Sequence, residues 1–176
     1  PYGFRPLMLG TYDDGGFAVA SESHTLTSLG AKYQREVSRG EVLTYDQTKN
    51  TMSSQYPFEE QPSKLCAFEF VYFSGPHGEL DSRSVHMVRK NMGKILAEEH
   101  PVDADLVIGV PDSGIPASEG FAEISGISKC SALVKNRYIS RTFIAPNQTE
   151  REDGVLKKFQ IIVPEIYGKK IVLVDD

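Results

Sequence analysis

Two short, uninterrupted apolar runs constrain the fold of this chain more than any other feature of its sequence. They are LVIGV at residues 106–110 and IVLV at residues 171–174. Continuous apolar strands are typical of parallel sheets that helices cover on both faces. Between them, residues 116–125 carry apolar side chains at helical spacing, and Gly126 follows as a predicted helix C-cap. The C-terminal part of the chain is therefore predicted to be α/β, with a parallel sheet.

Three more elements are predicted in this part. Residues 66–73 (CAFEFVYF) are rich in aromatic strand formers, and residues 131–134 (SALV) predict another short buried strand. Residues 81–100 carry a helical apolar pattern, whose start Asp81 or Ser82 can cap. Strands and helices thus alternate from residue 66 onwards, as a parallel sheet requires.

The first part of the chain has an antiparallel pattern instead. The sequence Asp-Asp-Gly-Gly at 13–16 separates residues 7–12 from residues 17–21, which predicts a β-hairpin. EVSRGEVLTY, with Gly40 at its bend, predicts a second hairpin. This part is therefore expected to be an antiparallel portion of an α+β domain.

A change of composition predicts where one domain gives way to the next. Residues 46–64 are polar, contain two prolines and show little periodicity, which is typical of a connector. We place one domain part with its connector at residues 1–60, and the α/β part at residues 61–176.

The composition argues against several classes of protein. The net charge of −5 argues against a nucleic-acid binder, whose footprint is a clustered basic surface. No stretch approaches the roughly 18 apolar residues of a membrane span. Cys66 and Cys130 are too few for a disulfide framework, so each is read first as a small buried side chain. A reducing, cytoplasmic setting fits best.

The first candidate site follows the apolar run at 106–110. In an open parallel sheet, ligands bind at the carboxyl ends of the strands. Here the chain continues into Pro111-Asp112-Ser113-Gly114 and then into a predicted helix, whose N–H groups can hold an anion. Ser113 can cap this helix or contact a ligand, and the two roles are compatible.

The second candidate site is a basic segment that follows the strand at 131–134. Six cations lie between residues 135 and 158: Lys135, Arg137, Arg141, Arg151, Lys157 and Lys158. Arg137 and Arg141 can hold phosphate in a bidentate manner, although a solvated loop would show the same charges. The nearby Tyr138, Phe143 and Ile144 favour a closing lid, because a merely solvated loop has little need of large apolar groups.

The third candidate site is the pair Asp175 and Asp176, which follows the apolar run at 171–174. Carboxylates at the end of a buried strand suit a hard cation or sugar hydroxyls. Together with the anion-binding turn and the basic segment, they predict a small ligand that carries phosphates and Mg²⁺.

These strings resemble a known family. VPDSGIPA, KNRYISRTFIAPNQTERE, GVLKKF and GKKIVLVDD are similar to the phosphoribosyltransferase half of the amidophosphoribosyltransferases, and CAFEFVYFSGPHGELDSRSV is similar to the start of that half. PYGFRPLMLG and FAVASES resemble the last part of the family's glutaminase domain. The resemblance runs the whole length of the chain.

The resemblance implies a fold and an activity. The fold would be part of an N-terminal-nucleophile glutaminase domain followed by part of a type I phosphoribosyltransferase domain. The enzyme would be a glutamine-dependent glycosyltransferase of purine biosynthesis, which converts PRPP, glutamine and water to 5-phosphoribosylamine, glutamate and pyrophosphate. Purine nucleotides would be inhibitors, and the full-length protein would be a homo-oligomer.

The resemblance also assigns roles to residues. Asp112, Ser113 and Gly114 match the pyrophosphate-binding turn, and Ser113, Asp175 and Asp176 match positions that serve the Mg²⁺–PRPP site. Residues 135–158, which include Lys135, Arg137, Tyr138, Arg141 and Lys158, match the mobile loop that closes over PRPP and helps to form the ammonia channel. Cys66 matches a position where some members carry one ligand of a [4Fe–4S] cluster, whereas Cys130 matches none.

The family pattern extends beyond both ends of this sequence. The nucleophilic cysteine is expected upstream and the phosphate-binding turn of the PRPP signature downstream. We therefore expect an internal part of a larger enzyme, with neither active site complete, inactive and poorly folded in isolation. Two other hypotheses remain: a non-catalytic PRPP- or nucleotide-binding module, and an interaction protein that uses the α/β part as a scaffold.

Overall fold

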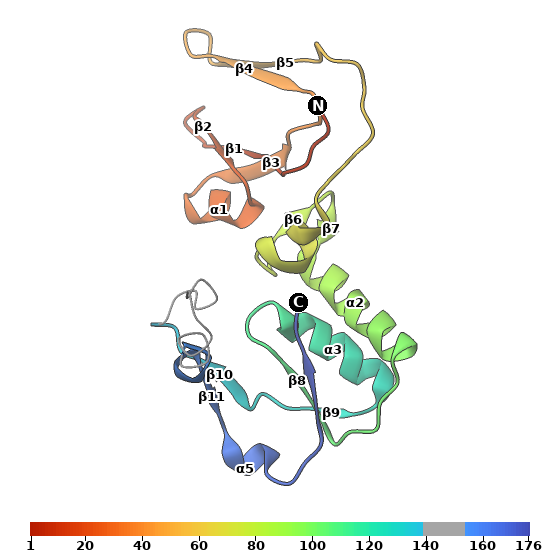
Figure 1. Cartoon of the computed structure of the whole chain (residues 1–176). Helices are drawn as coiled ribbons and strands as arrows, with labels where there is room; N and C mark the ends of the chain where they lie inside the picture. Colours follow the sequence, from red (N-terminus) through yellow and green to blue (C-terminus); the bar gives the residue numbers. More distant parts are fainter. Residues whose placement is uncertain (139–153) are drawn as a thin grey trace. The chain divides into compact units, whose positions relative to one another are not determined.

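The computed structural model describes residues 1–138 and 154–176 of the chain (Figure 1). The chain forms two compact units, Pro1–Val88 and Arg89–Asp176. The division between these units falls inside a helix, at Val88 and Arg89. The predicted boundary near residue 60 concerns the domains of the family, and it stays a prediction.

The first unit is built on a three-stranded antiparallel sheet. Its strands are β1 (Met8–Thr11), β2 (Phe17–Ala20) and β3 (Lys32–Glu36), in the order β2-β1-β3. The Asp-Asp-Gly-Gly turn joins β1 to β2, which confirms the first predicted hairpin. Within it, the Gly16 N–H donates to Asp14 Oδ1 at 3.0 Å, and Gly15 takes a φ of +91°, which glycine adopts at little cost.

The second predicted hairpin is wrong. Strand β3 pairs with β1, whereas β4 (Val42–Asp46) pairs antiparallel with β5 (Thr51–Gln55), a strand that lies in the predicted connector. The side chain of Asp46 sets this turn, because its Oδ1 accepts from the N–H groups of Thr48 and Lys49 at 3.0 and 3.2 Å. A polar composition hid the strand, since β5 has mostly exposed side chains.

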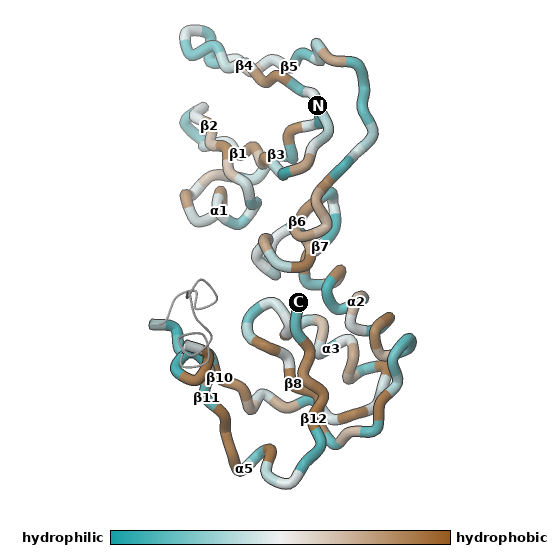
Figure 2. Tube along the Cα trace, viewed as in Figure 1, coloured by the Kyte–Doolittle hydropathy of each residue, from teal (hydrophilic) through white to brown (hydrophobic). Residues whose placement is uncertain are grey.

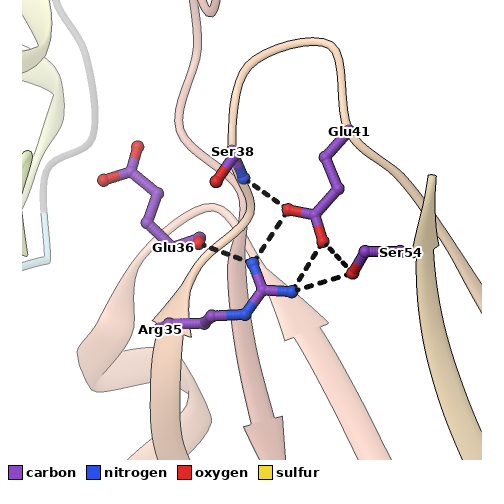
Figure 3. Close-up of polar contacts among 5 residues, drawn as sticks. All are labelled: Arg35, Glu36, Ser38, Glu41 and Ser54. Atoms are coloured by element: carbon purple, nitrogen blue, oxygen red, sulfur yellow. Dashed lines mark hydrogen bonds and ion pairs between the residues drawn. The ribbon is translucent and has the colours of Figure 1, made fainter. Parts of the chain in front are cut away.

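An ion-pair network joins these two sheets through the loop at Gly40 (Figure 3). Arg35 donates from both terminal nitrogens to the Glu41 carboxylate, at 2.8 and 2.6 Å, and the side chain of Glu41 is fully covered. Ser54 Oγ and the Ser38 N–H also donate to this carboxylate. The hydrogen bonds from Arg35 are the main cause that holds the pKa of Glu41 down at about 2.

The core of the first unit lies beneath its sheet. Helix α1 (Ser23–Ser28), which the sequence analysis did not predict, contributes the fully buried Leu26. The core is completed by a small apolar set: Met8, Ala31, Leu80 and Val85. Burial of this set is the main source of stability that the packing supplies to the unit.

The strand predicted over residues 66–73 is also wrong. The chain there is helical, and Glu69–Phe73 (η1) forms a π-helical turn. Glu69 is 3% exposed and its Oε1 lies 2.8 Å from Arg5 Nε, so the turn buries an ion-paired carboxylate at its start. Aromatic residues favour strands only weakly, and this tertiary contact overrides the preference.

A short hairpin replaces the predicted start of the following helix. Strands β6 (Glu79–Leu80) and β7 (Arg83–Ser84) pair antiparallel around Asp81 and Ser82. Asp81 and Ser82 have φ values of +50° and +57°, as a two-residue hairpin turn requires, so neither caps the helix. Helix α2 then begins at Val85 and ends at Glu99, inside the predicted range.

The second unit contains the predicted parallel sheet. Its strands are β8 (Leu106–Gly109), β9 (Ser128–Lys129) and β12 (Ile171–Val174), in the order β12-β8-β9, all parallel. Figure 2 shows β8 and β12 as apolar runs. Lys170 fixes the register of β12 against β8 where the two strands begin. Its N–H donates to Asp105 Oδ2 at 2.7 Å, and its Nζ lies 2.8 Å from Asp103.

Helix α3 (Gly114–Ser125) packs on this sheet and against the part of α2 that lies in the second unit. The two helices approach through glycines. A Cβ on Gly93 would lie 1.8 Å from Ala117 O, and one on Gly120 would lie 1.8 Å from Lys90 O. The predicted C-cap is confirmed, because Gly126 follows α3 with a φ of +72°.

The pair of helices is also held by charge. Glu123 on α3 accepts hydrogen bonds from Lys90 and Lys94 on α2, each at 2.8 Å. These bonds, first from Lys90 and then from Lys94, lower the pKa of Glu123 to about 2. The core below the contact contains Ala97, Val107, Phe121 and Val174.

The strand predicted over residues 131–134 forms in a different sheet. Strand β10 (Leu133–Lys135) pairs antiparallel with β11 (Phe159–Ile161), and the parallel neighbour of β8 is β9. Residues 154–158 are helical, and helix α5 (Val163–Ile166) follows β11. Among the helices that the structure describes, none is long and apolar enough to cross a membrane.

Candidate functional site at the strand ends

The carboxyl ends of β8 and β12 lie side by side. The register pairs Val174 with Gly109, and the Val110 N–H donates to Val174 O at 2.8 Å. The turn at Pro111–Gly114 therefore starts beside the point where Asp175 and Asp176 leave β12. Two of the three predicted sites thus share one edge of the sheet, as parallel pairing demands.

Close backbone approach fixes the turn against β12. The Gly114 N–H donates to Val110 O at 3.0 Å, and a Cβ on Gly114 would lie 2.5 Å from Val174 O and 3.4 Å from Asp175 Cα. Real Cβ atoms do not come within 3.0 Å of such a neighbour. Glycine is thus needed at this position for contact rather than for φ freedom.

A second close approach fixes the start of α3. A Cβ on Gly109 would lie 2.5 Å from Ser118 Oγ, and this hydroxyl, fully buried, donates to Ile115 O at 2.7 Å. Neither Gly109 nor Ser118 was predicted as a site residue. The G-V-P-D-S-G-I-P-A-S string contains both, but only the fold shows that they touch.

Ser113 stands at the N-cap position of α3 with helical dihedral angles, φ −69° and ψ −38°, and its side chain makes no cap hydrogen bond. Of the two roles considered from the sequence, capping is therefore not the one its hydroxyl performs. The peptide bond between Pro111 and Asp112 is cis. Asp112 is exposed and Gly114 is buried.

One ion pair connects this turn to the basic segment. Lys135, the last residue of β10, donates from Nζ to Asp112 Oδ2 at 2.5 Å. The side chains of Lys135 and Asp112 are 31% and 69% exposed, so the ion pair is at the protein surface and only partly covered by neighbouring residues. The structure thus brings together two predicted site residues from separate segments.

Of the other predicted cations, Arg137, Lys157 and Lys158 lie in or next to the β10–β11 pair. The Asn136 N–H donates to Lys158 O at 2.7 Å, and Asn136 Oδ1 accepts from the Tyr138 N–H at 3.0 Å. These bonds hold a turn in which Arg137 and Tyr138 are exposed, Tyr138 almost completely. Asn136 was not predicted, although Asn two residues before a turn N–H is a known signal. Arg141, Arg151, Phe143 and Ile144 lie outside the described residues.

The acidic pair is exposed at the end of β12. Within the described ranges, no group of three or more histidine, cysteine or acidic side chains could hold a metal ion by itself. Mg²⁺ differs from metals that need such a cage, since it is usually bound by one or two carboxylates together with substrate phosphates and water. Asp175 and Asp176, beside the turn that the sequence predicts to bind an anion, fit that donor set.

Cys66 and Cys130 are free thiols, both partly buried. Cys130 Sγ lies 4.0 Å from Glu165 Oε2, and Cys66 precedes the π-helical turn. An iron–sulfur cluster usually needs four thiolates, and the described residues do not gather them around Cys66. Its role as a cluster ligand stays a prediction.

Chemically, this edge of the sheet offers backbone donors at the start of α3, one lysine ammonium and two exposed carboxylates. Such a set can bind a polyphosphate through the donors and the ammonium, and a phosphate-bound cation through the carboxylates. Among the residues described at this edge, neither the Ser113 nor the Ser118 hydroxyl donates a hydrogen bond to a basic side chain. Binding and charge stabilisation are therefore the chemistry that it can supply.

Comparisons with known proteins agree on one family. The chain is 44% identical over its whole length to amidophosphoribosyltransferases of Synechocystis and of Bacillus subtilis, and 41% identical to that of Methanocaldococcus jannaschii. It spans 36% of the length of the first two relatives and 40% of the third. No family model matches the chain.

Two solved structures have the same fold over this length. One is described as the allosteric regulatory enzyme of purine biosynthesis; it aligns with all of this chain at a TM-score of 0.86 and 44% identity, which is 37% of its own length. The other is glutamine PRPP amidotransferase of B. subtilis in complex with ADP and GMP, with a TM-score of 0.85 and 43% identity over 99% of this chain and 38% of its own.

Proposed function

This chain belongs by sequence and by fold to the amidophosphoribosyltransferases, and on that premise we propose that the protein that carries it transfers nitrogen from glutamine to PRPP in purine biosynthesis. The products would be 5-phosphoribosylamine, glutamate and pyrophosphate. Residues 1–60 would belong to the glutaminase domain and residues 61–176 to a type I phosphoribosyltransferase domain.

A single observation carries the proposal for the transferase site. The turn at Pro111–Gly114 and the start of the Asp175–Asp176 pair are held at the ends of two hydrogen-bonded parallel strands, with Lys135 in contact with the turn. A leaving pyrophosphate needs cations and N–H donors, whereas its metal ion and the ribose need carboxylates. Both kinds of group lie at the same edge.

We assign the residues as follows. The backbone N–H groups of Ser113 and Ile115 at the start of α3, the Ser113 hydroxyl and the Lys135 ammonium bind the pyrophosphate of PRPP. Asp175 and Asp176 hold Mg²⁺ together with the substrate and orient the ribose. The chemistry that Mg²⁺ would supply there is partial neutralisation of the negative charge of the diphosphate. Arg137, Tyr138, Arg141 and Lys158 cover the bound substrate.

The chemistry follows from this placement. The bond between C1 and the pyrophosphate oxygen breaks through an oxocarbenium-like state, and ammonia released from glutamine attacks C1. Negative charge grows on the leaving oxygens, which the fixed donors and Lys135 stabilise. Covering the site keeps water from attacking C1 in place of ammonia.

Further parts of the proposal rest on the relatives. A relative binds ADP and GMP, which supports purine nucleotides as inhibitors. We also propose a homo-oligomer of the full-length protein, from the resemblance of the sequence to the family, and a cytoplasmic location, from its two free cysteines.

The test uses the full-length protein, with pyrophosphate release measured in the presence of PRPP, Mg²⁺ and either glutamine or ammonia. Asp175→Asn and Asp176→Asn are expected to lower the rate by about 10²-fold, as the loss of a preorganised charge contact does. Glu98→Gln is the control, because Glu98 is an exposed carboxylate on helix α2.

Unchanged rates in both variants would overturn the assignment of Asp175 and Asp176. A wild-type protein that binds PRPP without releasing pyrophosphate would favour the non-catalytic nucleotide-binding module instead.

A further inference from the structure

The ion pair between Asp112 and Lys135 has no obvious place in a site for a polyanion. Asp112 lies in the turn that would bind pyrophosphate, and its carboxylate carries the same sign of charge as that ligand. Its partner Lys135 is a cation whose ammonium contacts the turn directly. The cation that the ligand needs is thus already engaged.

Lys135 can change partner without movement of its backbone. Strand β10 is paired with β11 in a register that sets Lys135 opposite Phe159, and the next N–H along, that of Asn136, donates to Lys158 O. The main chain is therefore fixed on both sides of Lys135. The side chain is a flexible four-carbon stem with three rotatable donors, so its ammonium can turn from a carboxylate to a phosphate nearby.

Asp112 is equally suited to give up this contact. Its side chain is 69% exposed, so water can solvate the carboxylate after Lys135 leaves. The neighbouring Gly114 is pinned against Val174, which keeps the turn in place whichever partner Lys135 has. Exposed ion pairs are weak, so a diphosphate can displace the carboxylate.

We infer that Asp112 is a positioning residue that competes with pyrophosphate for Lys135. Without ligand, Asp112 holds the ammonium beside the turn. When the diphosphate binds, Lys135 transfers to it, and when the diphosphate leaves, Asp112 takes Lys135 back and assists its release. This inference rests on the proposed function and adds a determinant of product release to it.

The test is a double-mutant cycle in the full-length protein, read as the inhibition constant of Mg²⁺–pyrophosphate and as its dissociation constant by calorimetry. Asp112→Asn is expected to tighten pyrophosphate binding by about two- to fivefold, because it removes a weak competing ion pair. Lys135→Gln is expected to weaken it by about tenfold through loss of a charge-assisted contact.

In the Lys135→Gln background, Asp112→Asn is expected to give less than half of its gain, since no ammonium remains to be released. Asp112→Glu, which keeps the competing carboxylate, is the matched control and should retain the wild-type constants. A purely structural role for Asp112 would not tighten binding at all. Thermal unfolding of each variant checks that the fold is kept.

Several results would overturn the inference. Weaker binding in Asp112→Asn would show that the carboxylate itself contacts the ligand or its metal, and unchanged binding would show that the pair is inert. A gain of half or more in the Lys135→Gln background would show that Asp112 acts through its own charge. Wild-type protein that neither binds pyrophosphate nor consumes PRPP would overturn the proposed function, and the exchange with it.

Discussion

The substitution Gly114→Ala tests whether the turn at the end of β8 is the anion site. An alanine Cβ at this position would lie 2.5 Å from Val174 O and 3.3 Å from Val174 C. Both are backbone atoms of a strand that is hydrogen-bonded to β8, so neither can rotate away as a flexible side chain would. The turn itself must move.

The size of the effect follows from this overlap. Inserting one methyl group into a tightly packed site costs about 1–3 kcal/mol through shifts of the backbone. The shift separates the first N–H groups of α3 from Asp175, whose Cα lies 3.4 Å from the same point. A misplacement of about 1 Å in such a site can cost about 10²-fold in rate, so we expect a loss of that order in PRPP turnover.

The assay compares Gly114→Ala with Gly126→Ala in the full-length protein. A Cβ on Gly126 meets nothing within 4 Å, but its φ of +72° is unfavourable for alanine, so this variant loses about 1 kcal/mol of stability without touching the site. Both PRPP turnover and pyrophosphate affinity should fall in Gly114→Ala, and neither should fall in Gly126→Ala. If the two variants bind pyrophosphate equally well, the turn is not the anion site and the reasoning fails.

Two further predictions concern stability. Arg35→Gln should lower the stability of the first unit by about 1–2 kcal/mol at pH 7, a value reduced for the solvent that reaches 41% of the Arg35 side chain. Because the pKa of Glu41 is lowered from 4.5 to about 2, the stability that this ion pair contributes is present above about pH 4.5 and is lost as the pH falls toward 2. Amide hydrogen exchange in β3 and β5, compared between wild type and Arg35→Gln across that pH range, measures this contribution. A stability difference between the two proteins that persists at pH 2 would contradict the assignment. Gly93→Ala would place a Cβ 1.8 Å from Ala117 O and should lower the free energy of unfolding by about 3 kcal/mol or more, which a thermal melt detects as a lower unfolding temperature. An unfolding temperature equal to that of the wild type would show that α2 and α3 do not cross this closely.

The sequence predicted the two parallel strands whose ends carry the candidate site, but not the strand that pairs beside them. The parallel strands at 106–110 and 171–174 were identifiable because an unbroken apolar run leaves few alternatives, and parallel pairing then forces their carboxyl ends together. The neighbour β9 escaped detection, since its two residues, Ser128 and Lys129, are exposed and polar. The apolar residues 131–134 predict a strand instead, and the strand that forms there, β10, pairs in a different sheet.

Other errors came from contacts that are distant in sequence. Residues 66–73 favour a strand by composition, yet Arg5 ion-pairs with Glu69 across more than sixty residues and the chain there is helical. The contact between Asp112 and Lys135 depends likewise on how β10 lies, which no local pattern specifies. Pairing between separate segments is information that a propensity reading does not contain.

The register of β12 has a consequence for how this site can change during evolution. Lys170 is tied to Asp103 and Asp105 at one end of the strand, and Val174 is tied to Val110 at the other. Inserting or deleting one residue between these ties would displace Asp175 by about 3.3 Å and turn its side chain to the opposite face of the sheet. The number of residues in β12 is therefore constrained more strictly than their type. Substitutions along the strand can be tolerated, whereas a single-codon insertion or deletion would abolish the acidic end of the site.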